Sequence, residues 1–164
     1  MENKEHCTGR DNPVRISGYL KKNLLFLDLD AKEKTNAMAQ IVQLMKKNKA
    51  ITHEKEFLKQ VLEREKLGST AIGNNIALPH ARSKYAPNII ISFARLTHKV
   101  DFGIEEEKPV QLVFLMGTPP DSIGEYLKVL AQLSKLLKEE GIRKALLKAQ
   151  SPSDVIHIFS DAEN

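Results

Sequence analysis

The sequence lacks the residues that disulfide frameworks, structural zinc sites and membrane spans require. Only one cysteine, Cys7, occurs among 164 residues, so no internal disulfide and no cysteine pair for zinc can form. Val110–Met116 is among the longest apolar runs and falls far short of the ~20 residues needed to cross a bilayer. The charged N-terminus also lacks the apolar core of a signal peptide. We therefore expect a cytoplasmic protein in which Cys7 is an incidental thiol.

The composition is that of an ordinary globular protein with some excess positive charge. Apolar residues make up 41% and charged residues 28% of the chain, which is normal for one domain with a real core. The net charge of +4 and the pI of about 9.1 raise the question of nucleic-acid binding. However, lysine is interspersed with glutamate in helical stretches such as 54–66 and 135–148, and no basic run is interleaved with aromatics. We predict no nucleic-acid partner; a steeply salt-dependent affinity for DNA or RNA would contradict this.

The first half of the chain predicts a leader, a strand and two helices. Residues 1–15 are polar and aperiodic, so we expect a flexible leader before one domain of residues 16–160 and a tail of residues 161–164. Leu24–Leu29 is suited to a strand, after which Asp30 can cap a helix. Thr52 can cap a second helix, which ends at Gly68. The residues expected to face the core are Ala37, Met38, Ile41, Val42 and Met45 in the first helix and Phe57, Leu58, Val61 and Leu62 in the second.

The second half predicts two central strands and two further helices. Asn88–Leu96 and Val110–Met116 are rich in Ile, Val and Phe and barely alternate, which is typical of strands buried on both faces. A capping box at Ser122 opens a helix that we expect to end at Gly141, and Ser151 followed by proline begins a last helix. The fold class that this order predicts is α/β: a single-domain α/β sandwich with a mixed β-sheet covered by helices on both faces.

One histidine stands in a conformationally restricted segment. Pro79 fixes its own φ and restricts Leu78 to extended geometry, so His80 is held rather than mobile. The Gly73-Asn74-Asn75 segment upstream is suited to a tight turn with left-handed backbone. A neutral imidazole near pH 7 offers one unprotonated nitrogen as a nucleophile. These features make His80 a candidate catalytic residue that forms a covalent intermediate, although a histidine taken without its neighbours is more often structural than catalytic.

The neighbouring residues are suited to binding a phosphoryl group on that ring. A guanidinium can match the developing negative charge with two hydrogen bonds, and Arg64 and Arg82 are the local candidates. Further phosphate-binding candidates are the hydroxyls and turn amides of Ser69, Thr70, Asn74 and Asn75. Transfer between two imidazoles requires positioning and charge stabilisation. We therefore predict a shallow site with no metal and no cofactor.

The same segment resembles a known family over most of the chain. In order, the sequence carries Arg64-Glu-Lys, Gly68-Ser-Thr, a Gly-Asn turn, and Ile76-Ala-Leu-Pro-His80. This pattern is similar to that of the enzyme IIA domains of the bacterial sugar phosphotransferase system, of the mannitol/fructose and nitrogen-regulatory type. The resemblance implies that His80 is phosphorylated on Nε2 by an HPr-like phosphohistidine donor protein and that Arg64 supports it. It also implies an α/β sandwich around a mixed sheet.

The sequence departs from the family pattern at three positions. Many members have a second histidine on the helix after the last core strand, where this chain has Tyr126. Tyrosine can donate a hydrogen bond to phosphate but brings no positive charge, and a core-facing aromatic is an equally good interpretation. Ala71 and Asn75 replace frequent glycines, which weakens the expectation of backbone donors there, although asparagine tolerates positive φ.

Two functions remain open from the sequence: transfer to an enzyme IIB is the leading prediction, and a regulatory role is the alternative. As a sugar-transport component, the protein would pass the phosphoryl group from His80 to an enzyme IIB and make peripheral contact with a membrane permease complex. As a nitrogen-regulatory type IIA, it would instead bind a regulatory partner protein according to its phosphorylation state. The 164 residues include no segment resembling a permease, IIB or HPr, which favours the regulatory interpretation.

Overall fold

A single mixed β-sheet lies at the centre of residues 14–164, the part of the chain that the computed structural model describes. Most of the predicted leader, with Cys7, lies outside the described residues. Within the sheet, β1 is parallel to β5, β5 is antiparallel to β6, and β6 runs parallel to both β3 and β4. The strands, in sheet order, are β1 (Leu25–Leu29), β5 (Ile90–Asp101), β6 (Pro109–Thr118), β3 (Ile76–Ala77) and β2 (Ala71–Gly73), with β4 (His80–Arg82) also on β6.

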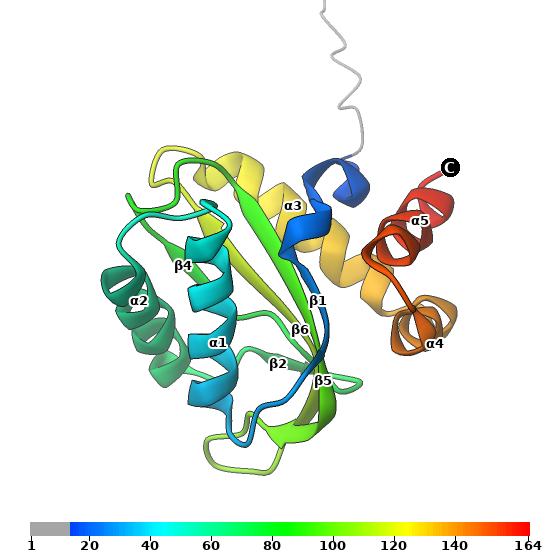
Figure 1. The fold of residues 1–164 in the computed structure, drawn as a ribbon, viewed down its shortest axis with the longest axis horizontal. Coiled ribbons are helices and arrows are strands. Elements are labelled where there is room, and N and C mark those ends of the chain that lie inside the picture. The colour runs from blue at the N-terminus through cyan, green and yellow to red at the C-terminus, as the bar shows by residue number, and fades with distance from the viewer. Residues whose placement is uncertain (1–13) are drawn as a thin grey trace, which may run out of the picture.

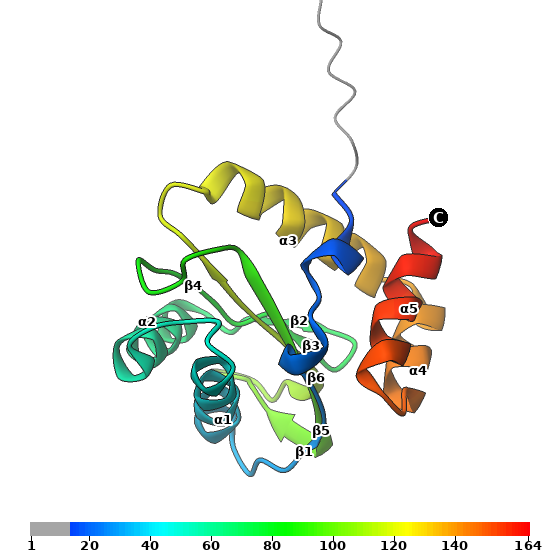
Figure 2. The same cartoon turned by 45° about the horizontal axis from the view of Figure 1, so that its top comes forward.

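Helices cover both faces of this sheet, as predicted (Figure 1). One face carries α1 (Lys34–Lys47) and α2 (Glu54–Leu67), and the other carries α3 (Ile123–Leu137), α4 (Glu140–Lys148) and α5 (Pro152–Ala162). Figure 2 shows the same separation from a second direction, with the sheet between the two groups. Two short 3-10 turns, η1 (Ile16–Tyr19) and η2 (Lys22–Leu24), lead into β1. Within residues 14–164, every helix is too short or too polar to span a bilayer.

The two long central strands are apolar without alternation because both of their faces are buried. Phe93 and Ala94 are neighbours in β5, yet Phe93 packs in the core under α3 and α5, whereas Ala94 packs in the core under α1 and α2. The predicted central strands are therefore confirmed. β5 continues beyond the predicted Leu96 to Asp101, because its pairing with β6 resumes at Val100 after an irregularity.

Helix interiors follow the predicted apolar stripes, but three predicted boundaries are wrong. Asp30 does not cap α1: its carboxylate accepts a hydrogen bond from Thr97 on β5 at 3.3 Å, and α1 begins after Glu33. Thr52 does not cap α2: its hydroxyl donates to the Tyr85 carbonyl at 3.4 Å, and α2 begins after His53. Gly141 does not end α3; it lies inside α4, and Arg143 Nη1 caps the end of α3 by donating to the Leu137 and Lys138 carbonyls.

Two predicted helix boundaries are confirmed. Gly68 follows the last residue of α2 and is its C-cap. Ser151 caps α5, accepting the Asp154 amide at 3.2 Å, with Pro152 as the first helical residue. The helix continues to Ala162, and the Glu163 carboxylate accepts the Ile16 and Ser17 amides at the start of η1. The last residues are thus fixed against the beginning of the described chain.

The segment between α2 and β5 forms three short strands that the sequence did not predict. β2 and β3 pair as a hairpin, and the turn between them has positive φ at Gly73 (91°), Asn74 (55°) and Asn75 (63°). This confirms the predicted left-handed turn. The hairpin reverses the chain so that Ile76 can lie beside β6, after which Pro79 leads into β4 along the same strand.

Candidate functional site

His80 is held by backbone pairing on the edge of the central sheet. It begins β4 opposite Met116 of β6, and the Met116 amide donates to the Pro79 carbonyl at 2.9 Å. The strand therefore fixes the main chain immediately before the ring, and Pro79 limits its remaining freedom. The His80 side chain is half-buried, so it is both constrained and accessible.

The imidazole of His80 has a defined orientation and proton location. Nδ1 lies 2.9 Å from the Leu78 carbonyl oxygen, and because a carbonyl can only accept, the neutral ring carries its proton on Nδ1. Nε2 then holds the free lone pair. Burial lowers the pKa of His80 below 6.5; the Leu78 carbonyl and Glu65 oppose this, while Arg64 lowers the pKa further. The ring is therefore neutral and nucleophilic at pH 7.

His80 lines a cavity of about 660 Å³ between α2, β4 and α3. The structure brings four of the predicted site residues to this cavity: His80, Arg64, Arg82 and Tyr126. Arg64 Nη1 donates to the Gly68 carbonyl at 2.9 Å, which holds the guanidinium at the C-terminal end of α2. The remaining lining residues are Gln60, Glu63, Leu67, Ala81, Ile123, Leu127 and Leu130.

Tyr126 and Gln60, two residues of the cavity lining, each have a buried polar atom without a hydrogen-bond partner in residues 14–164. The Tyr126 ring centroid lies 5.9 Å from that of His80, and the residue is only 4% exposed. Within the described residues, the buried side-chain atoms without a hydrogen-bond partner are Tyr126 Oη and Gln60 Oε1. Buried polar groups normally have partners, so each atom is a candidate to bond a ligand of the site. Burial also raises the pKa of Tyr126, which keeps the phenol a donor.

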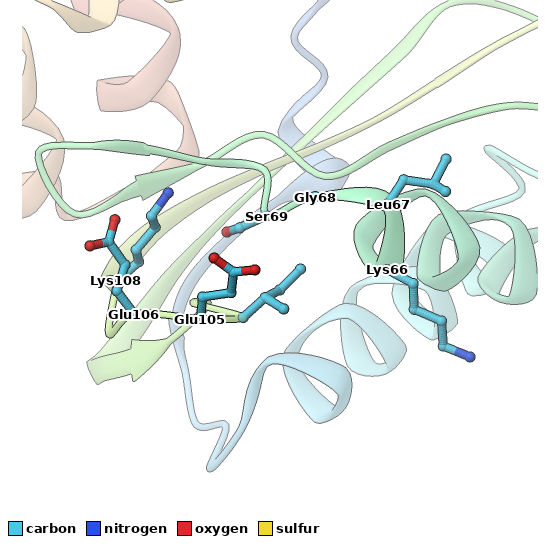
Figure 3. A pocket seen from close by; sticks show the side chains of 8 residues that line it. Lys66, Leu67, Gly68, Ser69, Glu105, Glu106 and Lys108 are labelled. Atoms are coloured by element: carbon cyan, nitrogen blue, oxygen red, sulfur yellow. The ribbon is translucent and has the colours of Figure 1, made fainter.

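Ser69 and Thr70 do not line the His80 cavity. Ser69 lines a neighbouring cavity of about 650 Å³ with charged residues of the β5–β6 loop (Figure 3). Its hydroxyl donates to the Phe102 carbonyl at 2.7 Å. Thr70 is buried, and its amide and hydroxyl both donate to the Glu65 carboxylate, at 3.1 and 2.6 Å. The side-chain donors of both residues are therefore occupied by the fold.

Asn74 and Asn75 lie farther along the turn, in a third cavity beside Pro109. Asn75 Nδ2 donates to the Pro109 carbonyl at 3.1 Å, and the Asn75 carbonyl accepts the Gln111 and Leu112 amides. These contacts tie the hairpin to β6. Both residues thus shape the segment that carries His80 instead of lining its cavity.

Sequence reasoning missed Gln60 and the apolar rim of the cavity. Gln60 lies four residues before Arg64, on the same face of α2, but nothing in its local sequence separates it from a solvated glutamine. Three apolar side chains of the lining are exposed: Leu67 by 85%, Leu127 by 56% and Ile123 by 38%. Within residues 14–164, no group of three or more His, Cys, Asp or Glu side chains could hold a metal ion.

Comparison with known proteins finds one family. The model for the phosphoenolpyruvate-dependent sugar phosphotransferase system, EIIA 2, matches residues 18–162. The fructose-specific EIIABC component of Bacillus subtilis is 33% identical over 147 residues, covering 90% of this chain and 23% of the relative. The chain therefore spans less than a quarter of that protein.

Solved structures show the same fold. The nitrogen regulatory protein IIA-Ntr from Neisseria meningitidis has a TM-score of 0.81 at 28% identity, covering 88% of this chain and 98% of that one. Enzyme IIA for mannitol from Escherichia coli, solved in complex with its phosphorylated enzyme IIB, has a TM-score of 0.75 at 24% identity. The match covers 87% of this chain and 97% of the mannitol enzyme IIA chain.

Proposed function

The chain belongs to the phosphoenolpyruvate-dependent sugar phosphotransferase system EIIA 2 family, and we propose that it is a histidine phosphocarrier that works through His80. The EIIA domains of this system are phosphotransfer components. The observation that carries the proposal is the 2.9 Å contact of His80 Nδ1 with the Leu78 carbonyl, because it leaves Nε2 unprotonated in a cavity flanked by two arginines.

The proposed reaction is an in-line transfer between two imidazoles. The lone pair of His80 Nε2 forms a bond to phosphorus while the N–P bond of the donor breaks, and its electron pair returns to the donor ring. No proton has to move, because the proton of His80 stays on Nδ1, hydrogen-bonded to the Leu78 carbonyl. Arg64 and Arg82 offset the charge of the phosphoryl oxygens, and the Tyr126 hydroxyl donates a further hydrogen bond.

The donor and acceptor are proteins that cover the apolar rim. Leu67, Ile123 and Leu127 surround the nucleophile and are exposed in the free protein, and such a patch beside a polar centre is typical of a protein-binding surface. We propose an HPr-like phosphohistidine protein as donor and an enzyme IIB as acceptor. Because phosphoenolpyruvate is the source of the phosphoryl group, this role also implies a cytoplasmic location.

Labelling tests the nucleophile. The protein is incubated with phosphoenolpyruvate, enzyme I and HPr, and its phosphorylation is followed by intact mass. We expect one phosphoryl group on the wild type, none on His80→Ala, and full labelling of the control His157→Ala, which removes an exposed histidine on α5. Unchanged labelling of His80→Ala would refute the assignment.

A second experiment separates docking from chemistry. Leu127→Glu places a charge on the apolar rim, whereas the control Leu147→Glu changes a similarly exposed leucine (44%) on α4, outside the cavity. We expect Leu127→Glu alone to slow labelling by phosphorylated HPr, while both variants react normally with phosphoramidate, a small N–P donor that needs no docking. Equal rates with phosphorylated HPr would rule out this surface.

A regulatory role is the second candidate, favoured by the similarity to a nitrogen regulatory protein over nearly its whole length. In that case phosphorylation changes the affinity for a regulatory protein instead of serving sugar uptake. Transfer from phosphorylated His80 to a purified enzyme IIB would favour transport. A partner that binds only the unphosphorylated protein, with no transfer to any IIB, would favour regulation.

A further inference from the structure

Glu65 is a buried carboxylate that lies outside the lining of the His80 cavity. It is 2% exposed, although it lies one residue after Arg64 on α2. A buried charge is costly unless it is paired and hydrogen-bonded. Here it accepts the amide and the hydroxyl of Thr70, and Lys34 Nζ at the start of α1 lies 3.8 Å away. The fold therefore keeps a negative charge directly behind the segment that leads to His80.

A series of hydrogen bonds connects this carboxylate to the reacting ring. The Thr70 amide donates to Glu65 Oε1 at 3.1 Å, the Leu78 amide donates to the Thr70 carbonyl at 3.0 Å, and His80 Nδ1 donates to the Leu78 carbonyl at 2.9 Å. The series passes through the backbone of Thr70 and of Leu78, so it fixes the positions of both residues relative to the carboxylate and to the ring. Figure 3 shows how the chain leaves α2 through Leu67, Gly68 and Ser69 toward this segment.

We propose that Glu65 is a positioning residue for His80: it fixes the Leu78 carbonyl against Nδ1 and counters the positive charge that the ring acquires when Nε2 bonds to phosphorus. This inference rests on the proposed function. A neutral ring that keeps its Nδ1 proton and shares the Nε2 lone pair with phosphorus becomes formally cationic. Arg64 and Arg82 stabilise the phosphoryl oxygens but disfavour that cation, and the negative charge of Glu65 offsets them.

The surrounding charges make the effect of Glu65 measurable. The charged side chains lining the His80 cavity are Glu63 and Arg64 on α2 and Arg82 on β4, and α3 contributes none. Glu65 itself raises the pKa of His80 against the larger effect of burial. Removing its charge while keeping its shape should therefore lower that pKa and weaken the phosphorylated state together.

Glu65→Gln tests this, with Glu56→Gln as the matched control. The side-chain carbonyl of the introduced glutamine can still accept the Thr70 amide, so the variant removes mainly the charge; Glu56 is exposed at the other end of the same helix. We expect Glu65→Gln to lower the His80 pKa in an NMR titration. We also expect it to shift the phosphorylation equilibrium with phosphoramidate about tenfold toward unphosphorylated His80. A tenfold change corresponds to about one pKa unit of lost charge stabilisation. Identical behaviour of the two variants would overturn the proposal.

A variant with the opposite sign distinguishes this role from simple packing. Lys34→Met removes the cation beside Glu65 and so strengthens the electric field of the Glu65 carboxylate at the ring. This variant should therefore raise the pKa of His80. A lowered pKa in both Lys34→Met and Glu65→Gln would mean that each merely loosens the segment, and would also overturn the proposal. If Glu65→Gln does not fold, Thr70→Val is tested in its place. We expect Thr70→Val to be phosphorylated less well than the wild type, and phosphorylation equal to that of the wild type would contradict the role of Glu65.

The titrations need no phosphoryl donor, so they remain decisive if the wild type fails to phosphorylate. That failure would refute the proposed phosphocarrier function. It would leave the influence of Glu65 on the His80 ring to be judged from the titrations.

Discussion

The unpaired hydroxyl of Tyr126 leads to a prediction in which stability and function change in opposite directions. A buried hydroxyl without a partner costs about 1–3 kcal/mol, and Tyr126 Oη has no hydrogen-bond partner among the described residues. Tyr126→Phe removes it without changing the ring, so we expect the free energy of unfolding to rise by about 1 kcal/mol. For a chain of this size, that corresponds to an increase in Tm of about 2–4 °C.

The same substitution should weaken the phosphorylated state. A phosphoryl group on His80 would supply the acceptor that Tyr126 lacks, and a hydrogen bond to a charged group contributes about 1.5–3 kcal/mol. We expect phosphorylation of Tyr126→Phe by phosphoramidate to be about tenfold less favourable. This outcome would decide between the two interpretations of Tyr126, as a core-facing aromatic or as a phosphate ligand.

Urea unfolding followed by circular dichroism, together with the phosphorylation equilibrium, provides the assay. Tyr19→Phe is the control, because the Tyr19 hydroxyl already donates to the Glu125 carboxylate and its removal should bring no gain in stability. A Tyr126→Phe protein that is no more stable than the wild type, yet is phosphorylated equally well, would refute the reasoning. It would mean that the hydroxyl is satisfied in the free protein and has no role in the site.

Three further predictions follow from other parts of the fold. Arg95 is 8% exposed and donates to the Leu146, Leu147 and Ala149 carbonyls at the end of α4; Arg95→Met should lower the free energy of unfolding by about 3 kcal/mol in urea titrations. Gly117→Ala would place a methyl group 3.1 Å from the Phe57 ring, which should cost about 1–3 kcal/mol and slow phosphorylation by displacing α2. His80 binds a proton less readily in the folded than in the unfolded chain, because its pKa is lowered by folding. The free energy of unfolding should therefore fall as the pH drops from 6.5 toward the folded-state pKa, and level off below it. If the difference in unfolding free energy between wild type and His80→Ala does not vary with pH in this range, the direction of the pKa shift is wrong.

Sequence reasoning recovered the elements whose signals are local and periodic. The apolar stripe from Ala37 to Met45 predicted the buried face of α1 because helical spacing alone determines which side chains share a face. The caps at Asp30 and Thr52 failed because their polar groups are engaged by Thr97 and Tyr85, which are distant in sequence. The strands β2, β3 and β4 were missed because each spans too few residues to show a period.

The candidate site also contains residues that the sequence could predict and residues that it could not. His80 and Arg64 could be predicted from a short motif, and the structure brings them to one cavity. Ser69 and Thr70 belong to that motif too, but their donors are occupied by Phe102 and Glu65. Tertiary contacts decide which residues of a motif face the ligand and which hold the backbone. The spacing of residues in the sequence does not reveal those contacts. Gln60 could not be predicted for the same reason.

The end of α2 explains why adjacent residues of the motif have opposite charges. Successive helical side chains point about 100° apart, so Arg64 reaches the His80 cavity while Glu65 turns inward to Thr70. The C-terminus of a helix carries partial negative charge, which would repel a phosphoryl group placed beside it. Arg64 donates to the Gly68 carbonyl, and its guanidinium makes the electrostatic potential at this end of the helix positive on the side that faces the cavity. One rigid element thus presents a cation to the phosphoryl oxygens and an anion to the segment behind the ring, and any shift of α2 would change both together.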